Sequence, residues 1–177
     1  VIDFEIKKGQ IKSVITNQKR KIETDSVILA IGHSARDTFT MLNKNKIKME
    51  PKPFAVGVRV QHPQEKINYS QYGKFKDMLP PATYKLTYHS SNGRGVYSFC
   101  MCPGGYVVNA SSEDRRLAIN GMSNHSRDSK NANSAIVVTV IPNDFNGNLF
   151  RGLEFQEKLE EKTYEIGGGK IPIQTLK

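Results

Sequence analysis

The segment DSVILAIGHS, residues 25–34, carries the clearest fold signal of the chain. Its middle, residues 27–31, is continuously apolar, which is typical of a strand covered on both faces, as in a parallel sheet. We expect this strand to end at Gly32, because Ser34 and Asp37 then fit the capping box that opens a helix. The segment therefore predicts a buried strand, a glycine turn and a helix N-terminus in succession.

Upstream of this segment, the chain reads as short strands joined by turns. Residues 1–6 and 11–16 alternate between apolar and polar side chains around a turn at Gly9, and residues 22–23 resume an extended path. The sequence opens inside such a strand pattern and lacks an initiator Met, so we expect an internal piece of a longer protein.

Beyond Pro51 apolar residues recur at every second position, which is the spacing typical of strands. Residues 54–60 alternate strictly, and residues 83–101 read as a hairpin. Further strands are expected at residues 106–110, 117–120 and 135–141. Near the end of the chain, helical spacing of apolar residues predicts a helix that stops at the three glycines 167–169.

These patterns together predict an α+β fold with two kinds of domain. We expect residues 1–50 to be the tail of a dinucleotide-binding, Rossmann-like domain. Residues 51–147 should form a mostly antiparallel, barrel-like β domain, and residues 148–177 a helix and a return linker.

The composition is that of a globular protein, with 37% hydrophobic and 24% charged residues. The apolar stretches are far shorter than a bilayer span and no signal-peptide pattern is present, so we expect no membrane association. Two cysteines are too few for a disulfide framework, which favours the reducing cytoplasm. Four scattered histidines lack ligand spacing, so no metal site is expected.

The net charge of +9 admits a second class of function, a basic module that binds nucleic acid or another polyanion. A nucleic-acid face needs contiguous lysines that are interleaved with exposed aromatic residues. Here the lysines alternate with apolar residues in strand patterns, which is typical of solvated strand faces. The polyanion-binding module is therefore kept as the alternative function.

The turn at Gly32 is the first candidate binding site. A glycine before a helix N-terminus lets backbone amides approach a phosphate, and the helix dipole favours negative charge there. An ordinary strand-to-helix turn would show the same residues. His33 follows the glycine and is a candidate for hydrogen bonding to a cofactor or for acid–base chemistry.

Cys100 and Cys102 frame a second candidate site. In a regular strand their sulfurs would point the same way and could exchange electrons with a cofactor. Their Cα atoms would then be roughly 6.5–7 Å apart, at the upper edge for a disulfide, and simple burial of the cysteines is the alternative. The following turn, Pro103, Gly104 and Gly105, can bring backbone close to a ring or a substrate.

Residues 120–133 (NGMSNHSRDSKNAN) read as a long polar loop between strands. Such a loop is commonly only solvated, but long loops also gather binding groups. Arg127 is a candidate partner for an anionic substrate or a pyrophosphate. The candidate residues that face substrate or flavin are Pro103, Gly104, Gly105, Asn120, Ser123, Arg127, Asn131 and Asn133.

Several distinctive motifs accompany these candidates. They are GHSARDT at 32–38, KPFAVGVR at 52–59, YSFCMCPGG at 97–105, NGMS at 120–123 and NANSA at 131–135. In combination they closely resemble a family of uncharacterised bacterial FAD-dependent dehydrogenases. Residues 1–32 also resemble the β-meander and following strand of glutathione-reductase-type flavoproteins.

The resemblance implies a parent protein that transfers hydride through FAD to or from a small-molecule substrate, with NAD(P) as a candidate electron donor. In such flavoproteins a small-residue motif like that at residues 30–32 closes over FAD. The implied cofactor contacts are Ala30, Gly32, His33, Ser34 and Arg36, and the candidates for catalysis are Cys100, Cys102 and His33.

The departures from the flavoprotein pattern limit what this chain can do by itself. The Gly-x-Gly-x-x-Gly fingerprint is absent, and so is the acidic residue that would hold the ribose. We therefore expect the isolated chain to bind FAD weakly or not at all and the chemistry to need the rest of the parent chain.

Overall fold

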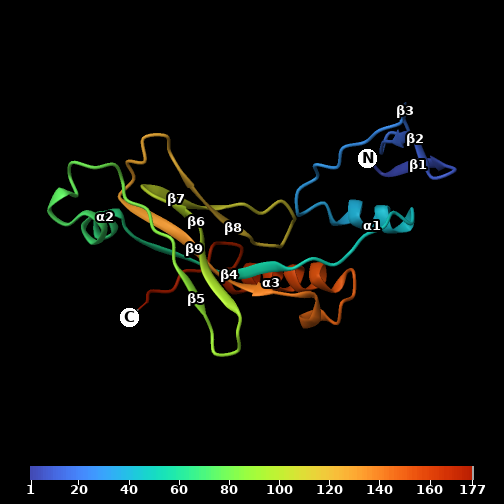
Figure 1. The fold of residues 1–177 in the computed structure, drawn as a ribbon. Coiled ribbons are helices and arrows are strands. Elements are labelled where there is room, and N and C mark those ends of the chain that lie inside the picture. Colours follow the sequence, from blue (N-terminus) through green and yellow to red (C-terminus); the bar gives the residue numbers. More distant parts are fainter. Residues whose placement is uncertain (177) are drawn as a thin grey trace. The chain divides into compact units, whose positions relative to one another are not determined.

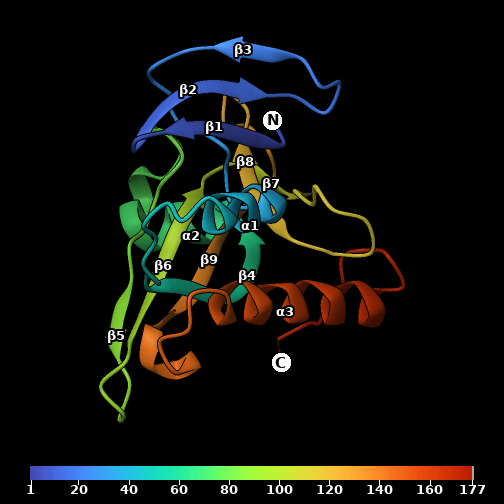
Figure 2. The ribbon, with the colours of Figure 1, turned by 90° about the vertical axis from the view of Figure 1, so that its right-hand side faces the viewer.

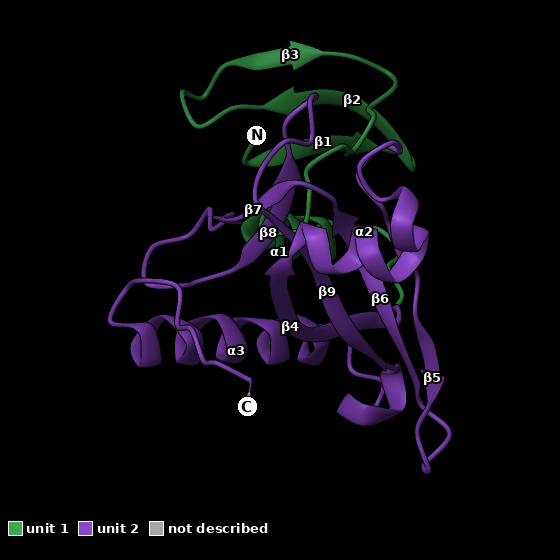
Figure 3. Ribbon diagram, turned by 90° about the vertical axis from the view of Figure 1, so that its left-hand side faces the viewer, with its two compact units in different colours: residues 1–50 green, residues 51–177 purple. Residues whose placement is uncertain are grey.

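The computed structural model describes residues 1–176 of the chain (Figure 1). The chain divides into two compact units, Val1–Glu50 and Pro51–Lys177, which Figure 3 shows in different colours. Each unit has its own strands and its own helices.

The first unit consists of a small antiparallel sheet and one helix. Its strands pair in sequence order and are β1 (Asp3–Lys7), β2 (Gln10–Ile15) and β3 (Lys21–Glu23). The helix α1 (Arg36–Lys44) follows a long coil. Phe4 from the sheet packs with Met41 and Leu42 from the helix to form a small buried core. The three strands agree with the alternation in the sequence.

The predicted buried strand at residues 27–31 does not form, and that prediction is wrong. The run is irregular, and Ile28 is 93% and Leu29 49% exposed. A strand covered on both faces needs a neighbour along its edges. Among the described residues the three strands of this unit pair only with one another, so a Rossmann-like sheet is not seen.

The predicted capping box of α1 is also wrong. The N-cap is Ala35, and no side chain caps the helix. Asp37 instead accepts a hydrogen bond from the neighbouring Thr38 amide, 2.8 Å away. The Ser34 hydroxyl lies 3.3 Å from Nδ1 of His33. The local hydrogen bonds of the short polar side chains thus replace the cap that their spacing predicted.

The second unit is built on a four-stranded antiparallel sheet. In spatial order its strands are β4 (Phe54–Pro63), β9 (Asn131–Val140), β6 (Gly95–Cys102) and β5 (Thr87–His89). β4 and β9 pair along their full length, from Phe54 opposite Val140 to Pro63 opposite Asn131. The β-branched residues that fill both strands favour this extended pairing.

A separate two-stranded sheet, β7 (Gly105–Asn109) and β8 (Ile119–Ser123), follows β6 in the chain. All pairs in the three sheets are antiparallel, which confirms that prediction. The barrel-like closure is wrong. β4 and β5 are edge strands of an open sheet, and the short strands β7 and β8 pair only with each other instead of closing it.

Two helices and two short 3-10 turns complete the second unit. They are α2 (Gln64–Tyr72), η1 (Gly73–Phe75), η2 (Pro142–Phe145) and α3 (Arg151–Gly167). The sequence predicted α3 and its stop at the glycines, where Gly168 is the left-handed C-cap. It did not predict α2, whose apolar residues do not recur at helical spacing.

α3 lies next to β4 (Figure 2) and is fixed there by aromatic packing. The Phe54 ring lies 6.0 Å from both the Phe145 and Phe155 rings, measured between centroids. Further along α3, Glu157 and Glu161 each form an ion pair with Arg116, at 3.1 Å. No helix among residues 1–176 is long and apolar enough to cross a bilayer.

The tip of the β5–β6 hairpin is tied to η2 by Arg94 and Asp144. The guanidinium donates to both carboxylate oxygens, with 2.7 Å between Nη1 and Oδ2, and the Ile141 amide donates to Oδ2 at 2.9 Å. These contacts lower the pKa of Asp144 from 3.8 to about 2. The hydrogen bond from Arg94 has the largest effect, and the one from the Ile141 amide has the next largest. The ion pair therefore stabilises the folded state only while the carboxyl is ionised.

We expect Asp144→Asn to flatten the acid limb of the stability profile. The pKa of Asp144 is lower in the folded state, so its stabilisation is complete above the unfolded-state pKa. It is lost as the pH falls from about 5 towards about 2. Melting temperatures across that range should fall less for Asp144→Asn than for the wild type. Asp128→Asn, in an exposed loop, is the control, and equal acid slopes for wild type and Asp144→Asn would contradict the assignment.

Candidate functional site

β6 ends in a β-bulge at the first of the two cysteines. Phe99 lies opposite Ala135 and Cys102 opposite Asn133, so β6 carries one residue more than β9. Cys100 takes up this excess in the left-handed region, with φ of +49°. A residue with a Cβ pays about 1–2 kcal/mol for that conformation, which glycine normally occupies in such bulges.

The bulge gives the two cysteines different surroundings, so the regular-strand geometry expected for them is wrong. Cys100 is exposed and Cys102 is buried, and both are free thiols. The Cys102 thiol donates to the backbone oxygen of Cys100 across 3.3 Å. Burial raises the pKa of the Cys102 thiol, the Cys100 thiol raises it further, and the Arg59 guanidinium acts in the opposite direction.

Arg59 of β4 holds this bulge from the side. Its Nη1 donates to the Asn133 side-chain oxygen at 2.6 Å and to the Cys100 backbone oxygen at 3.1 Å. Nη2 lies 3.5 Å from the Asn120 side-chain oxygen. These acceptors are all uncharged, so within the described residues the guanidinium has no carboxylate partner. Arg59 was not among the residues predicted from the sequence, although a single charge in an otherwise apolar alternating strand could have revealed it.

Gln64, at the start of α2, anchors the turn that follows the cysteines. It is buried, and its side-chain oxygen accepts a hydrogen bond from the Gly104 amide at 2.7 Å. Its side-chain nitrogen donates to Asn68 at 2.7 Å and to the Ala82 backbone oxygen at 3.0 Å. One side chain thus joins the turn, the helix and the loop before β5. Gln64 was not predicted as a site residue, because the helix α2 that carries it was not predicted either.

The polar loop lies directly against the same turn. Gly104 has φ of +47°, and a Cβ there would lie 1.8 Å from the Arg127 backbone oxygen. The Ser123 hydroxyl donates to the Pro103 backbone oxygen at 2.7 Å, and the Ser129 amide to the Gly104 oxygen at 3.3 Å. The structure therefore brings together the turn and the part of the predicted loop that surrounds Arg127.

A pocket of about 580 Å³ opens where the turn and the loop meet. Its lining is Pro80, Pro81, Met101, Cys102, Pro103 and residues 123–127. One side is apolar and contains the sulfur atoms, and the other carries exposed polar side chains that include His125 and Arg127. A concave site with an apolar wall and a few polar groups suits a small organic ligand.

A second hollow of similar size lies between residues 113–116 and α3. Its lining is almost entirely charged, and Arg116 there is already paired with Glu113 at 2.8 Å as well as with α3. Ion pairs that satisfy one another are typical of a structural contact, so this hollow is not a ligand-binding candidate.

Both ends of the predicted loop belong to strands instead. Asn120 and Ser123 lie in β8, and Asn131 and Asn133 open β9, so their assignment to the loop is wrong. The ladder with β4 begins at Asn131, four residues before the expected start of the strand at residue 135. Asn133 is fully buried, and its side-chain nitrogen has no hydrogen-bond partner among the described residues. With Asn120 it positions Arg59 beside the bulge.

A histidine and a tyrosine form a further pair near the end of β4. Nε2 of His62 lies 2.8 Å from the Tyr84 hydroxyl, and the two rings are 5.5 Å apart between centroids. Burial lowers the pKa of His62 and raises the pKa of Tyr84, so both groups are held in their neutral forms near neutral pH. Among the described groups, Nδ1 of His62 has no hydrogen-bond partner.

The expected cofactor contacts lie in the first unit. Ala30, Gly32 and His33 are exposed, whereas Arg36 is buried at the start of α1. Gly32 has φ of +68° and no atom within 4 Å of the position of a Cβ. Ala30, Gly32 and His33 are therefore accessible, and the described part of the unit does not enclose a ligand around them.

We expect Gly104→Ala to destabilise the second unit by roughly 2–4 kcal/mol, because the new Cβ meets the Arg127 backbone in a left-handed conformation. Gly93→Ala is the matched control, since Gly93 has φ of +79° with open space around it. That variant should lose only about 1 kcal/mol. Urea unfolding measures both, and equal losses would contradict the close approach at Gly104.

We expect Gln64→Leu to cost roughly 2–4 kcal/mol, because the Gly104 amide and the Ala82 carbonyl lose their buried partner. Gln71→Leu, at an exposed position of the same helix, should change stability by less than about 0.5 kcal/mol. The comparison uses the free energy of unfolding in urea. A neutral Gln64→Leu would show that the turn does not depend on this side chain.

Known proteins place this site in a family. An uncharacterized protein of Clostridium beijerinckii is 52% identical to the chain over 176 residues, which is 96% of this chain and 33% of that protein. The chain thus spans about a third of the length of this relative. A family described as FAD-dependent protein, C-terminal domain-like, matches residues 53–177, which include the bulge, the turn and the pocket. The chain therefore belongs to the FAD-dependent protein, C-terminal domain-like family.

Proposed function

We propose that this chain is part of an FAD-dependent oxidoreductase, a dehydrogenase, and forms one wall of the chamber where a small-molecule substrate meets the flavin. The observation that carries the proposal is the pocket between the turn 102–105 and the loop 123–127, inside the region that matches the family. The substrate itself is not specified by this pocket.

The pocket can orient a ligand because hydrogen bonds fix the turn whose first residue, Pro103, lines it. Pro103, Gly104 and Gly105 are all buried, and hydrogen bonds from Gln64 and Ser123 fix the turn. A flavin enzyme needs the protein mainly to bind, orient and electrostatically tune the reacting groups. A turn held by several hydrogen bonds supplies the rigid support that such orientation requires.

The opposite side of the pocket favours an anionic group on the ligand. His125 and Arg127 are exposed at its edge, and Arg127 is held by the backbone contact at Gly104 with φ of +51°. Arginine binds carboxylates and phosphates through paired hydrogen bonds. We assign Arg127 to the recognition of a negatively charged substrate or cofactor group, and Ser123 lines the pocket beside it.

The described residues do not by themselves make a complete FAD site. Gly32 has open space around it, and the apolar run 27–31 has no strand beside it among residues 1–176. We propose that Ala30, Gly32, His33, Ser34 and Arg36 contact FAD once the remaining parts of the dinucleotide-binding domain are present. FAD supplies the hydride transfer, and NAD(P) is the candidate electron donor.

The extent of the exposed surface supports a larger protein. The accessible area is 12969 Å². A folded monomer of 19.9 kDa has about 8,700 Å², and two separate domains of these sizes have about 10,000 Å² in total. The accessible area beyond these values includes large apolar side chains, such as Ile28, Val58 and Phe99, which are more than half exposed. Surfaces of this kind usually face other protein segments.

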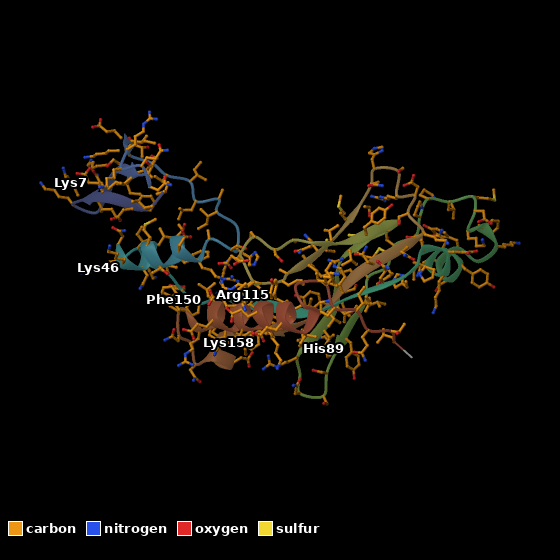
Figure 4. The ribbon with its side chains drawn as sticks, turned by 180° about the vertical axis from the view of Figure 1, so that it is seen from behind. Lys7, Lys46, His89, Arg115, Phe150 and Lys158 are labelled. Carbon is orange, nitrogen blue, oxygen red and sulfur yellow. The ribbon has the colours of Figure 1, made fainter. Side chains whose placement is uncertain are left out.

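The alternative, a basic module for nucleic acid, has less support. Figure 4 labels Lys7, Lys46, Arg115 and Lys158, and these come from four separate segments of the two units. Other lysines pair with carboxylates, as Lys76 does with Glu65 at 3.0 Å. Dispersed and paired lysines do not make the contiguous basic face that phosphate backbones require.

We expect the full-length protein that contains this chain to purify with about one FAD per molecule, visible as flavin absorption bands. Residues 1–177 alone should be colourless, because the dinucleotide-binding fingerprint is absent from them. Within the full-length protein, Arg127→Ala should shift the flavin spectrum, whereas Arg151→Ala, an exposed position on α3, should not. A colourless full-length protein that also fails to bind added FAD would overturn the proposal.

A further inference from the structure

The two cysteines at the bulge differ in a way that suits them to successive steps of one reaction. Cys100 is exposed and can meet a molecule from solution, whereas Cys102 is buried and lines the pocket. Thiol–disulfide exchange needs one accessible thiol that attacks and a second thiol that resolves the intermediate. The order of accessibility therefore assigns attack to Cys100 and resolution to Cys102.

The geometry at the bulge places the Cys102 sulfur back against residue 100. Its distance of 3.3 Å to the Cys100 backbone oxygen shows that the side chain does not point away along a regular strand. The separation of Cα atoms in an extended strand, roughly 6.5–7 Å, is at the edge of disulfide geometry. The backbone at Cys100, with φ of +49°, departs from that extended geometry.

The surroundings hold the bulge in this form and supply positive charge. Arg59 donates to the Cys100 backbone oxygen at 3.1 Å, and the Ser134 hydroxyl donates to the Phe99 oxygen at 3.3 Å. The pKa of the Cys102 thiol stays raised by burial, and the same guanidinium, which has no carboxylate partner among the described residues, offsets part of that effect. A cation beside a buried thiol eases the loss of its proton in the resolving step.

We propose that Cys100 and Cys102 form a redox-active dithiol that reduces small-molecule disulfides. The Cys100 thiolate attacks one sulfur of the disulfide, a mixed disulfide forms, and the first thiol leaves. Cys102 then gives up its proton and attacks the Cys100 sulfur, which releases the second thiol. Two electrons pass from the protein to the small disulfide, and a Cys100–Cys102 bond remains. This activity goes beyond the flavin-dependent function and does not require FAD.

Glutathione disulfide is the probe, and the full-length protein is treated with it, quenched in acid and digested with trypsin. Both cysteines lie in the tryptic peptide of residues 95–115, so other cysteines of the protein do not interfere. In the wild type this peptide should lose two hydrogen atoms in mass and carry no lasting glutathione. Glutathione that stays on Cys100, or a bond between two molecules, would overturn the proposal without any variant.

Two conservative variants separate the steps. Cys102→Ser should trap glutathione on Cys100, because no thiol resolves the mixed disulfide. Cys100→Ser should react at least about tenfold more slowly, since its remaining thiol is buried. If this peptide is unmodified after treatment of the folded wild-type protein but is modified after treatment in urea, the cysteines are structural and the proposal is wrong. The flavin content of the same sample reports on the proposed function separately.

Discussion

The single extra residue in β6 is the constraint on which the site depends. Between Phe99 and Cys102, β6 has one residue more than the facing segment of β9 between Ala135 and Asn133. This residue forms a β-bulge, in which Cys100 has a left-handed conformation. Past this point the chain leaves the four-stranded sheet and enters the pair β7–β8. The bulge therefore sets where the turn 102–105 begins, which cysteine is buried and which strand carries the polar loop.

Two buried or half-buried polar side chains hold this irregular backbone in place. Arg59 holds the bulge and Gln64 holds the turn, and each bonds to segments that are far apart in the sequence. Burying such groups is costly unless their hydrogen bonds are made. The same requirement makes them specific, because a shifted strand register would leave both side chains without partners.

The sequence was most informative where the structure follows from local patterns. The alternation in β4 and the glycines after α3 predicted those elements, and the motifs around Pro103 and Ser123 identified segments that the structure brings into contact. The failures have physical causes. The run 27–31 has the composition of a buried strand but no described neighbour, α2 lacks an apolar period, and a bulge occupied by cysteine instead of glycine leaves no signal in composition.

The two units contribute differently to the proposed chemistry. The pocket, its turn and the bonds of Gln64, Ser123 and Ser129 all lie within Pro51–Lys177, so this wall is organised without help from the first unit. The first unit presents Gly32 and the run 27–31 without a surrounding sheet. A preformed wall needs no further ordering when a ligand binds, which suits the second unit to the substrate-positioning role that we propose for it. In the same proposal FAD binding involves the first unit together with other parts of the longer protein, so it is separate from the thiol chemistry at the bulge.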